Sequence, residues 1–152
     1  MSTFKTPSIP PDSLLKTWRT IDQAVVQHLS RKGMPFSIAA SLVHLYIHPE
    51  LTEPAQLADA LFIPRQSMTF TLDALERDAL ATRQPHPNDR RKKIIVLTAK
   101  GRKQAKTILD DLLHFEAQAF AAFTQEEFLT LRTLLTKLMT TITLLDIQGG
   151  AR

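Results

Sequence analysis

The sequence predicts a mainly helical α+β fold with one small β-hairpin, and three observations predict it. Apolar residues recur at helical spacing in long segments toward both ends of the 152-residue chain. Two shorter segments of the same kind follow each other near the middle, separated by a tight turn. A basic, turn-rich stretch then separates two short segments with strand character.

The composition excludes several classes of protein. Hydrophobic residues make up 43% of the chain, enough for a packed core. The net charge is +4 and the sequence pI is about 9.6, so the placement of the positive charge matters more than its amount. The absence of cysteine excludes disulfides and thiol catalysis. No apolar segment has signal-peptide or membrane-spanning length, so we expect a cytoplasmic protein that stays off membranes.

Two helices are expected in the first third of the chain. Residues 10–13, Pro-Pro-Asp-Ser, combine a break with capping residues, and apolar side chains then recur at helical spacing. Gly33, preceded by basic residues, suits the end of this first helix. A second helix should start near Pro35. It should end before His48-Pro49, because the residue before a proline is pushed out of the α region.

The next two helices form a pair. Residues 52–54, Thr-Glu-Pro, open a short helix, and Pro64 can take the first turn of its successor, where a missing N–H costs nothing. In that successor Met68, Leu72 and Leu75 share one face. The opposite, outward face carries Arg65, Gln66, Thr69, Phe70 and Asp73. Two short helices split by a tight turn are typical of a helix-turn-helix.

A β-hairpin is predicted directly after this pair. Residues 81–84 have strand character, residues 85–92 are rich in turn formers and positive charge, and residues 93–97 are β-branched and apolar. A hairpin with a basic tip in this position is a wing.

Two long helices close the chain. Thr98 can cap the first of them with its hydroxyl, and Thr124-x-x-Glu127 is a capping box for the second. The second carries an apolar stripe at Phe128, Leu131, Leu134, Leu135, Leu138, Ile142 and Leu145. Each helix should run to about 24 residues, or roughly 36 Å.

From about Ser13 to Ile147 the chain resembles the MarR family of winged helix-turn-helix transcription regulators. The residues that carry the resemblance are Asp89-x-Arg91 and Leu97-Thr98-x-x-Gly101, followed by Arg102. The resemblance implies a homodimer that binds double-stranded DNA at a pseudo-palindromic operator, as a ligand-responsive repressor. The chain departs from the family at Lys92-Lys93, where glycine often follows the wing arginine, and at Phe70, where arginine is common.

The expected organisation follows from these elements. Residues 13–32 and 98–147 form a helical dimerisation region, residues 35–97 form the winged DNA-binding lobe, and residues 1–12 and 148–152 are flexible tails. The apolar stripes of the long helices at both ends of the chain would be exposed on a monomer, and exposed apolar patches of that extent are rare on monomers. The alternative is a larger helical core within one chain. The residues expected at the dimer interface are Leu14, Leu15, Trp18, Phe128, Leu131, Leu135, Leu138 and Ile142.

The side chains expected to contact DNA fall into three groups. Arginine and glutamine match guanine and adenine edges, which suits the outward face of the second paired helix to reading bases. The resemblance assigns Asp89 the role of holding the Arg91 guanidinium at the minor groove. The recognition-helix residues are Arg65, Gln66, Ser67, Thr69 and Phe70; those of the wing are Arg83, Asp89, Arg90, Arg91, Lys92 and Lys93; Lys100 and Arg102 either contact phosphates or are ordinary surface charge.

Two further groups of residues are candidate binding sites. Trp18, His28 and Tyr46 either line a pocket for a small aromatic or amphipathic effector, as the resemblance implies, or belong to the core. His44 and His48 have the spacing of a metal pair, and Glu50 and His114 are the available third ligands, although neither is an obvious one. Two histidines near a helix end are more often surface or capping residues, so no metal or cofactor is predicted.

The sequence does not support catalysis. It has no HExxH, no GxSxG and no glycine-rich phosphate loop. The alternative to a regulator is a winged-helix protein–protein adaptor that has lost specific DNA binding, and a more remote one is nonspecific DNA packaging.

Overall fold

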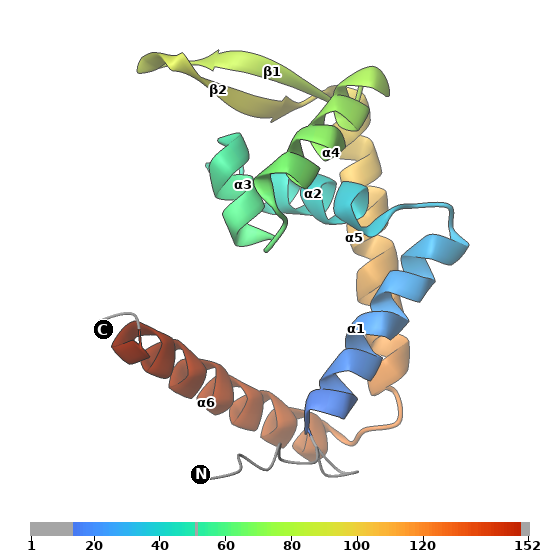
Figure 1. Ribbon diagram of the computed structural model, residues 1–152. Coiled ribbons are helices and arrows are strands. Elements are labelled where there is room, and N and C mark those ends of the chain that lie inside the picture. Colours follow the sequence, from blue (N-terminus) through green and yellow to red (C-terminus); the bar gives the residue numbers. More distant parts are fainter. Residues whose placement is uncertain (1–13, 51, 150–152) are drawn as a thin grey trace, which may run out of the picture. The chain divides into compact units, whose positions relative to one another are not determined.

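The computed structural model describes residues 14–50 and 52–149, which form six helices and one two-stranded antiparallel sheet (Figure 1). This confirms the mainly helical fold class. The chain divides into two compact units, the first ending at Asp110 and the second beginning at Asp111. The predicted tail 1–12 lies outside the described residues, as do residues 150–152. The elements are α1 (Leu14–Arg31), α2 (Phe36–Ile47), α3 (Pro54–Ala60), α4 (Arg65–Arg77), β1 (Ala81–His86), β2 (Asp89–Leu97), α5 (Ala99–Phe120) and α6 (Gln125–Gly149).

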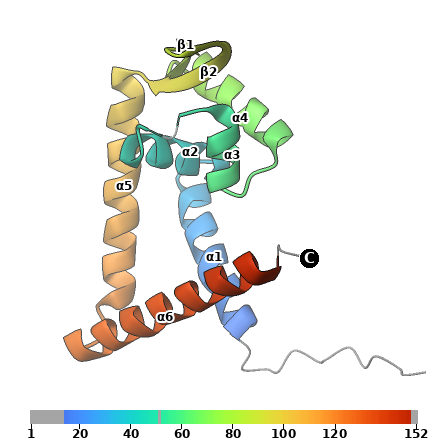
Figure 2. The same ribbon diagram turned by 90° about the vertical axis from the view of Figure 1, so that its left-hand side faces the viewer.

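The core of the first unit lies among α2, α3, α4 and the hairpin, which gather together in both views (Figures 1 and 2). Its members are apolar side chains that the helical spacing places on inward faces, so their burial is the main stabilising contribution. The largest fully buried side chains are Leu42, Leu57, Met68, Leu72, Leu75 and Ile95, joined by the small polar Ser41.

Three helices end in the same hydrogen-bonding pattern. After α1, α3 and α4 the chain passes through a left-handed residue, at Gly33 (φ 70°), Phe62 (φ 52°) and Ala79 (φ 56°). At the end of α4, the Ala79 N–H donates to the Glu76 carbonyl at 2.9 Å and the Leu80 N–H to the Leu75 carbonyl at 2.8 Å. This is a Schellman motif, which satisfies the last carbonyls and turns the chain sharply. The predicted helix end at Gly33 is confirmed.

A close backbone approach joins the hairpin to α5. The Thr98 hydroxyl accepts from the Gly101 N–H at 2.9 Å and donates to the Ala79 carbonyl at 2.8 Å. Thr98 therefore caps α5 as predicted and also ties it to the end of α4. A Cβ on Gly101 would lie 1.8 Å from the Leu80 carbonyl oxygen, so only glycine fits. This geometry explains the Thr98-x-x-Gly101 spacing.

The hairpin is longer than the sequence predicted. Ala81 pairs with Leu97 and Gln84 with Ile94, and after an irregularity at Pro85/His86 the ladder ends at His86 opposite Asp89. Proline and basic residues weakened the strand signal here. They are tolerated because a two-stranded sheet consists of edge strands, whose outer sides need no further partner strand.

The second unit contains the end of α5 and the whole of α6. The predicted capping box is confirmed: the Thr124 N–H donates to Glu127 Oε2 at 2.8 Å and the Glu127 N–H to Thr124 Oγ1 at 3.2 Å. The bond from the Thr124 N–H lowers the pKa of Glu127 most, and the Thr124 hydroxyl, which donates to Glu127 Oε2 at 3.0 Å, lowers it further. Phe120 and Phe128 meet edge to face at 5.0 Å between ring centroids. No residue of Gln125–Leu145 is buried.

Candidate nucleic-acid interface

The outward face of α4 is exposed over its whole length. Met68, Leu72 and Leu75 are buried and fix the rotation of the helix about its axis. Because Gln66 and Phe70 lie four residues apart, they share the opposite face, one turn apart. Phe70 is 67% exposed. Each of the five side chains predicted to read or flank bases is exposed: Arg65, Gln66, Ser67, Thr69 and Phe70.

Two of these five side chains already have partners within the protein. The Arg65 guanidinium lies 3.5 Å from the carboxylate of Asp59 on α3, and both side chains are largely exposed. An exposed pair of this kind contributes little to stability, so a competing acceptor can replace Asp59. The Thr69 hydroxyl donates to the Arg65 carbonyl one turn earlier, at 3.1 Å. It can still accept a hydrogen bond from a base or water.

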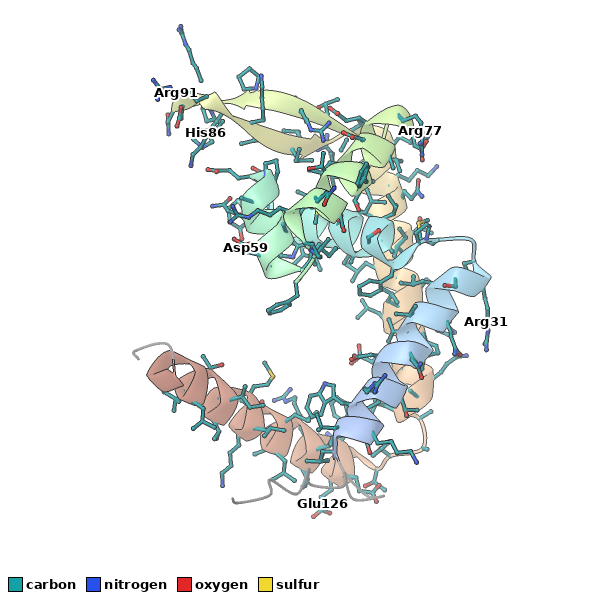
Figure 3. The ribbon with its side chains drawn as sticks, in the orientation of Figure 1. Arg31, Asp59, Arg77, His86, Arg91 and Glu126 are labelled. Carbon is teal, nitrogen blue, oxygen red and sulfur yellow. The ribbon has the colours of Figure 1, made fainter. Side chains whose placement is uncertain are left out.

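Three basic side chains at the wing have no carboxylate partner in the described part of the chain. These are Arg90, Arg91 and Lys93, all exposed on β2. Figure 3 shows Arg91 at the tip of the hairpin, away from Arg77 at the end of α4. The wing therefore presents uncompensated positive charge beside the outward face of α4, which an anionic polymer would favour.

The wing aspartate differs from its predicted role. Asp89 Oδ1 accepts a hydrogen bond from the Arg91 backbone N–H at 3.0 Å, and the described residues show no ion pair between this carboxylate and the Arg91 guanidinium. The short aspartate side chain reaches the backbone N–H two residues ahead more easily than it reaches the guanidinium at the end of the arginine side chain, as in other Asx turns. Asp89 here shapes the turn at the wing tip and leaves the guanidinium free.

Lys92 is engaged by a carboxylate of another element. Its ammonium nitrogen lies 3.0 Å from Glu53 Oε2 and 3.1 Å from Glu53 Oε1. Glu53 immediately precedes α3, and its backbone N–H donates to Gln56 Oε1 at 3.3 Å. His86 Nε2 lies 3.9 Å from the same carboxylate. The segment leading into α3 is thus tied to the wing, and the Ile95 N–H bond to the Thr52 carbonyl at 2.9 Å adds to the link.

Arg83 is held at the root of the wing by two carboxylates of α4. Its Nη2 lies 2.8 Å from Asp73 Oδ1, its Nη1 donates to Glu76 Oε2, and its backbone N–H donates to Glu76 Oε1 at 2.8 Å. Partial burial lowers the pKa of Arg83, but the hydrogen bond that its guanidinium donates to Asp73 and the charge of Glu76 outweigh it and raise the pKa above its ordinary value. The sequence did not single out these carboxylates as partners.

The basic residues at the start of α5 are partly explained by the fold. Lys100 Nζ donates to the Asp78 carbonyl at 2.8 Å, next to the end of α4, where a cation is favourable. Lys106 pairs with Asp110 at 2.6 Å, and this hydrogen bond raises its pKa. Arg102 is exposed and forms no ion pair within the described residues. Of the two predicted phosphate contacts, Arg102 is therefore the better placed.

The three residues of the predicted effector pocket are not brought into one hollow. A hollow of about 220 Å³ in the first unit is lined by Tyr46, Leu45, strand residues 94–97 and Arg102, among others. Trp18 and His28 do not line it. Trp18 is 40% exposed on α1, and His28 is half-buried.

His44 on α2 and His48, which directly follows the helix, have their ring centroids 4.9 Å apart. Burial and the neighbouring His48 lower the pKa of His44, whose Nε2 is buried and has no hydrogen-bond partner among the described residues. His48 Nδ1 lies 3.3 Å from Glu50. In the described part of the chain no three metal-binding side chains cluster.

Large apolar side chains are exposed on α1 and on α6. On α1 the leucines at positions 14 and 15 are each about two-thirds exposed. On α6 the spacing places the exposed Leu134, Leu135 and Ile142 on one face together with the half-buried Leu138. The predicted interface residues Leu14, Leu15, Trp18, Leu135 and Ile142 are exposed, whereas Phe128, Leu131 and Leu138 are half-buried.

Helix α6 is also long and apolar enough to span a membrane by length and composition, with a mean hydropathy of 1.3 over Gln125–Leu145. Most of its large apolar residues lie on one side, however; Thr133, Lys137 and Thr140 lie on the other side, together with Leu129 and Leu144. Thr133 and Thr140 donate their hydroxyls to carbonyls one turn earlier, whereas Lys137 keeps a charge on this side of the helix. A membrane span is apolar all round, so this pattern favours a helix that packs against other protein.

Comparison with known proteins identifies the winged part of the chain. Residues 32–92, which include α2, α3, α4, β1 and the tip of the wing, match the model of the MarR family. The regulators of this family are not enzymes, in agreement with the expectation from the sequence.

A curated relative and several solved structures are similar to the chain over most of its length. The HTH-type transcriptional regulator PecS of Dickeya dadantii (strain 3937) is 29% identical over 111 residues, which cover 73% of this chain and 58% of PecS. The crystal structure of the transcriptional regulator PA3341 matches with a TM-score of 0.72 and 23% identity, over 86% of this chain and 95% of that one.

The MepR–DNA complex of S. aureus also matches, with a TM-score of 0.68 and 22% identity, over 85% of this chain and 94% of MepR. At this level of identity the structural likeness establishes the fold alone.

Proposed function

We propose that this protein is a sequence-specific regulator of transcription that binds double-stranded DNA. One observation carries the proposal: the exposed face of α4, which carries Gln66 in its first turn, lies beside a wing whose Arg90, Arg91 and Lys93 have no carboxylate partner among the described residues. A recognition helix needs side chains that match base edges, and a wing needs free cations for phosphates. The match of the winged part to the model of the MarR family supports the same function. Such a protein acts in the cytoplasm, where bacterial DNA lies.

We further propose that it acts as a homodimer on a pseudo-palindromic operator. The apolar faces of α1 and α6 are exposed in the single chain, and a second copy offers the same faces in return. Two recognition helices related by a twofold axis read inverted half-sites whose centres lie about 34 Å, or one helical turn, apart.

Regulation by a small molecule is the third part of the proposal. A ligand changes DNA affinity only if it prefers one arrangement of the two winged lobes. Tyr46 lines a hollow that also contains Arg102, which fits an aromatic or amphipathic acid acting as inducer of a repressor. Titrating a panel of such acids against the protein–DNA complex tests this part. A complex that no acid in the panel weakens would leave a regulator without a ligand.

The experiment that tests the central proposal is selection of binding sites from random-sequence duplexes with the full chain. We expect enrichment of a motif with two inverted half-sites about one turn apart. Binding without enrichment would indicate nonspecific packaging, and an absence of binding at low salt would overturn the proposal in favour of a protein–protein adaptor.

Two variants separate the proposed roles of wing and helix. Arg91→Ala should weaken binding to the selected operator and to random DNA by similar factors, and should reduce the slope of log K against log salt by about 0.9. Gln66→Ala should cost about 1–3 kcal/mol on the operator and much less on random DNA. Unchanged affinity and slope for Arg91→Ala would mean that the wing does not touch DNA.

A further inference from the structure

Two carboxylates project from α4 close to the face proposed to read DNA. Asp73 follows Phe70 by three residues and Gln66 by seven, so the spacing places it on the outward face, and its side chain is 56% exposed. Glu76 lies one turn further along and is 34% exposed. Duplex DNA carries one negative charge for about every 1.7 Å of its length. Left uncompensated, these two side chains would repel the polymer that the helix is proposed to enter.

Arg83 contacts both of these carboxylates. One end of its guanidinium lies 2.8 Å from Asp73 Oδ1, the other donates to Glu76 Oε2, and its backbone N–H donates to Glu76 Oε1 at 2.8 Å. Its side chain is 28% exposed, whereas that of Lys92, the other paired wing cation, is 52% exposed. The planar guanidinium fork suits this double role, since its donors point in fixed directions.

We propose that Arg83 promotes DNA binding indirectly, by neutralising Asp73 and Glu76 and fixing the root of the wing to α4, and that it is not a phosphate ligand. The proposal rests on the proposed DNA-binding function. Its geometric basis is that both ends of the guanidinium are occupied. To reach a phosphate, Arg83 would have to leave two carboxylates uncompensated beside the same DNA. Arg83 is thus a positioning residue, and the free cations of the wing remain the candidates for phosphate contact.

A double-mutant cycle distinguishes the two roles. The affinity of the full chain for one selected duplex is measured over a range of salt concentrations for wild type, Arg83→Ala, Asp73→Asn/Glu76→Gln and the triple variant. We expect Arg83→Ala to weaken binding at least tenfold in the wild-type background. In the Asp73→Asn/Glu76→Gln background it should weaken binding less than threefold, because no charge is left to neutralise. The salt slope should change by much less than 0.9.

Arg90→Ala is the matched control, because Arg90 is an exposed wing arginine without a carboxylate partner in the described part of the chain. Arg90→Ala should weaken binding of the duplex by the same factor in both backgrounds and lower the slope of log K against log salt by about 0.9. Thermal unfolding checks that each variant is folded. Should Arg83→Ala fail to fold, Arg83→Gln removes the charge, keeps a hydrogen-bond donor and should show the same dependence on background.

The outcomes separate this inference from the proposed function. If wild type binds the duplex and Arg83→Ala costs the same factor in both backgrounds with a slope reduced by about 0.9, Arg83 is a phosphate ligand and only the inference fails. If wild type binds no duplex, the proposed function and the inference both fail.

Discussion

At the scale of single residues, Ala79 occupies a backbone conformation that disfavours a side chain. Its φ is 56°, it is exposed, and it ends α4 in a Schellman motif. An L-residue in this region costs roughly 1–2 kcal/mol, and glycine avoids that cost but loses part of the gain to its greater freedom in the unfolded chain. We predict that Ala79→Gly raises the free energy of unfolding by about 0.5–1 kcal/mol in urea denaturation.

Ala74 provides the control for this substitution. It lies inside α4, where glycine costs about 1 kcal/mol relative to alanine, so Ala74→Gly should destabilise the protein. Equal losses of stability at both positions would show that Ala79 does not hold the left-handed conformation.

Phe70 offers a chemical test of base recognition. It stands where the family often has arginine, and an aromatic ring can contact the 5-methyl group of thymine but cannot bind phosphate. Replacing thymine by deoxyuridine in the selected operator removes only that methyl group. We predict that the replacement weakens wild-type binding about fourfold at one position of the half-site. This factor corresponds to the roughly 0.8 kcal/mol that burial of one methyl group contributes. Phe70→Ala should bind both duplexes equally, and a variant that keeps the full methyl sensitivity would contradict this role.

At the scale of elements, the link between Glu53 and the wing affects the charge available to DNA. Lys92 lies 3.0 Å from Glu53, a pairing that competes with phosphate for its ammonium group. We predict that Glu53→Gln raises affinity for random DNA by about threefold and steepens the salt dependence by up to about 0.9. Binding measured against salt checks both. Glu50→Gln, which removes a carboxylate next to His48, is the control and should leave the slope unchanged.

The sequence predicted those features of the elements that depend on residues close together in the chain. Gly33 at the end of α1, Thr98 at the start of α5 and the Thr124–Glu127 capping box each involve partners within a few residues, so spacing reveals them. The wing was predicted at the correct position in the chain, but its two strands were predicted too short. Its outer half is held by cross-strand pairing, which residue preferences for strand do not report.

The candidate site was less predictable, because its electrostatics depend on residues distant in the chain. Arg83 and Lys92 looked like free wing cations in the sequence, yet Arg83 pairs with carboxylates 7 and 10 residues away and Lys92 with one 39 residues away. The resemblance to the family also suggested that Asp89 holds the Arg91 side chain, whereas in the structure its carboxylate takes the nearer backbone N–H. Which cations are free for DNA was therefore decided by tertiary contacts alone.

At the scale of the whole molecule, the apolar face of α6 argues for a second copy of the chain. Soluble monomers rarely expose contiguous apolar patches larger than a few hundred Å², and α6 has no buried residue between Gln125 and Leu145. Leu134, Leu135 and Ile142 all contribute to one face. A membrane would accept these side chains but not the threonine and lysine face behind them, whereas a protein partner can leave that face in water.

We predict that the wild-type protein sediments at micromolar concentration with twice the chain mass of 17.1 kDa. Leu135→Glu/Leu138→Glu should yield monomers or an unfolded chain, because burying two carboxylates without partners costs far more than the apolar contact gains. A folded monomer should lose most of its affinity for the two-half-site operator while keeping weak binding to a single half-site, since the second contact is no longer tethered to the first. Thr140→Glu, on the opposite face of α6, should remain a dimer with unchanged affinity. A Leu135→Glu/Leu138→Glu dimer, or a wild-type monomer well above micromolar concentration, would rule out α6 as the dimer interface.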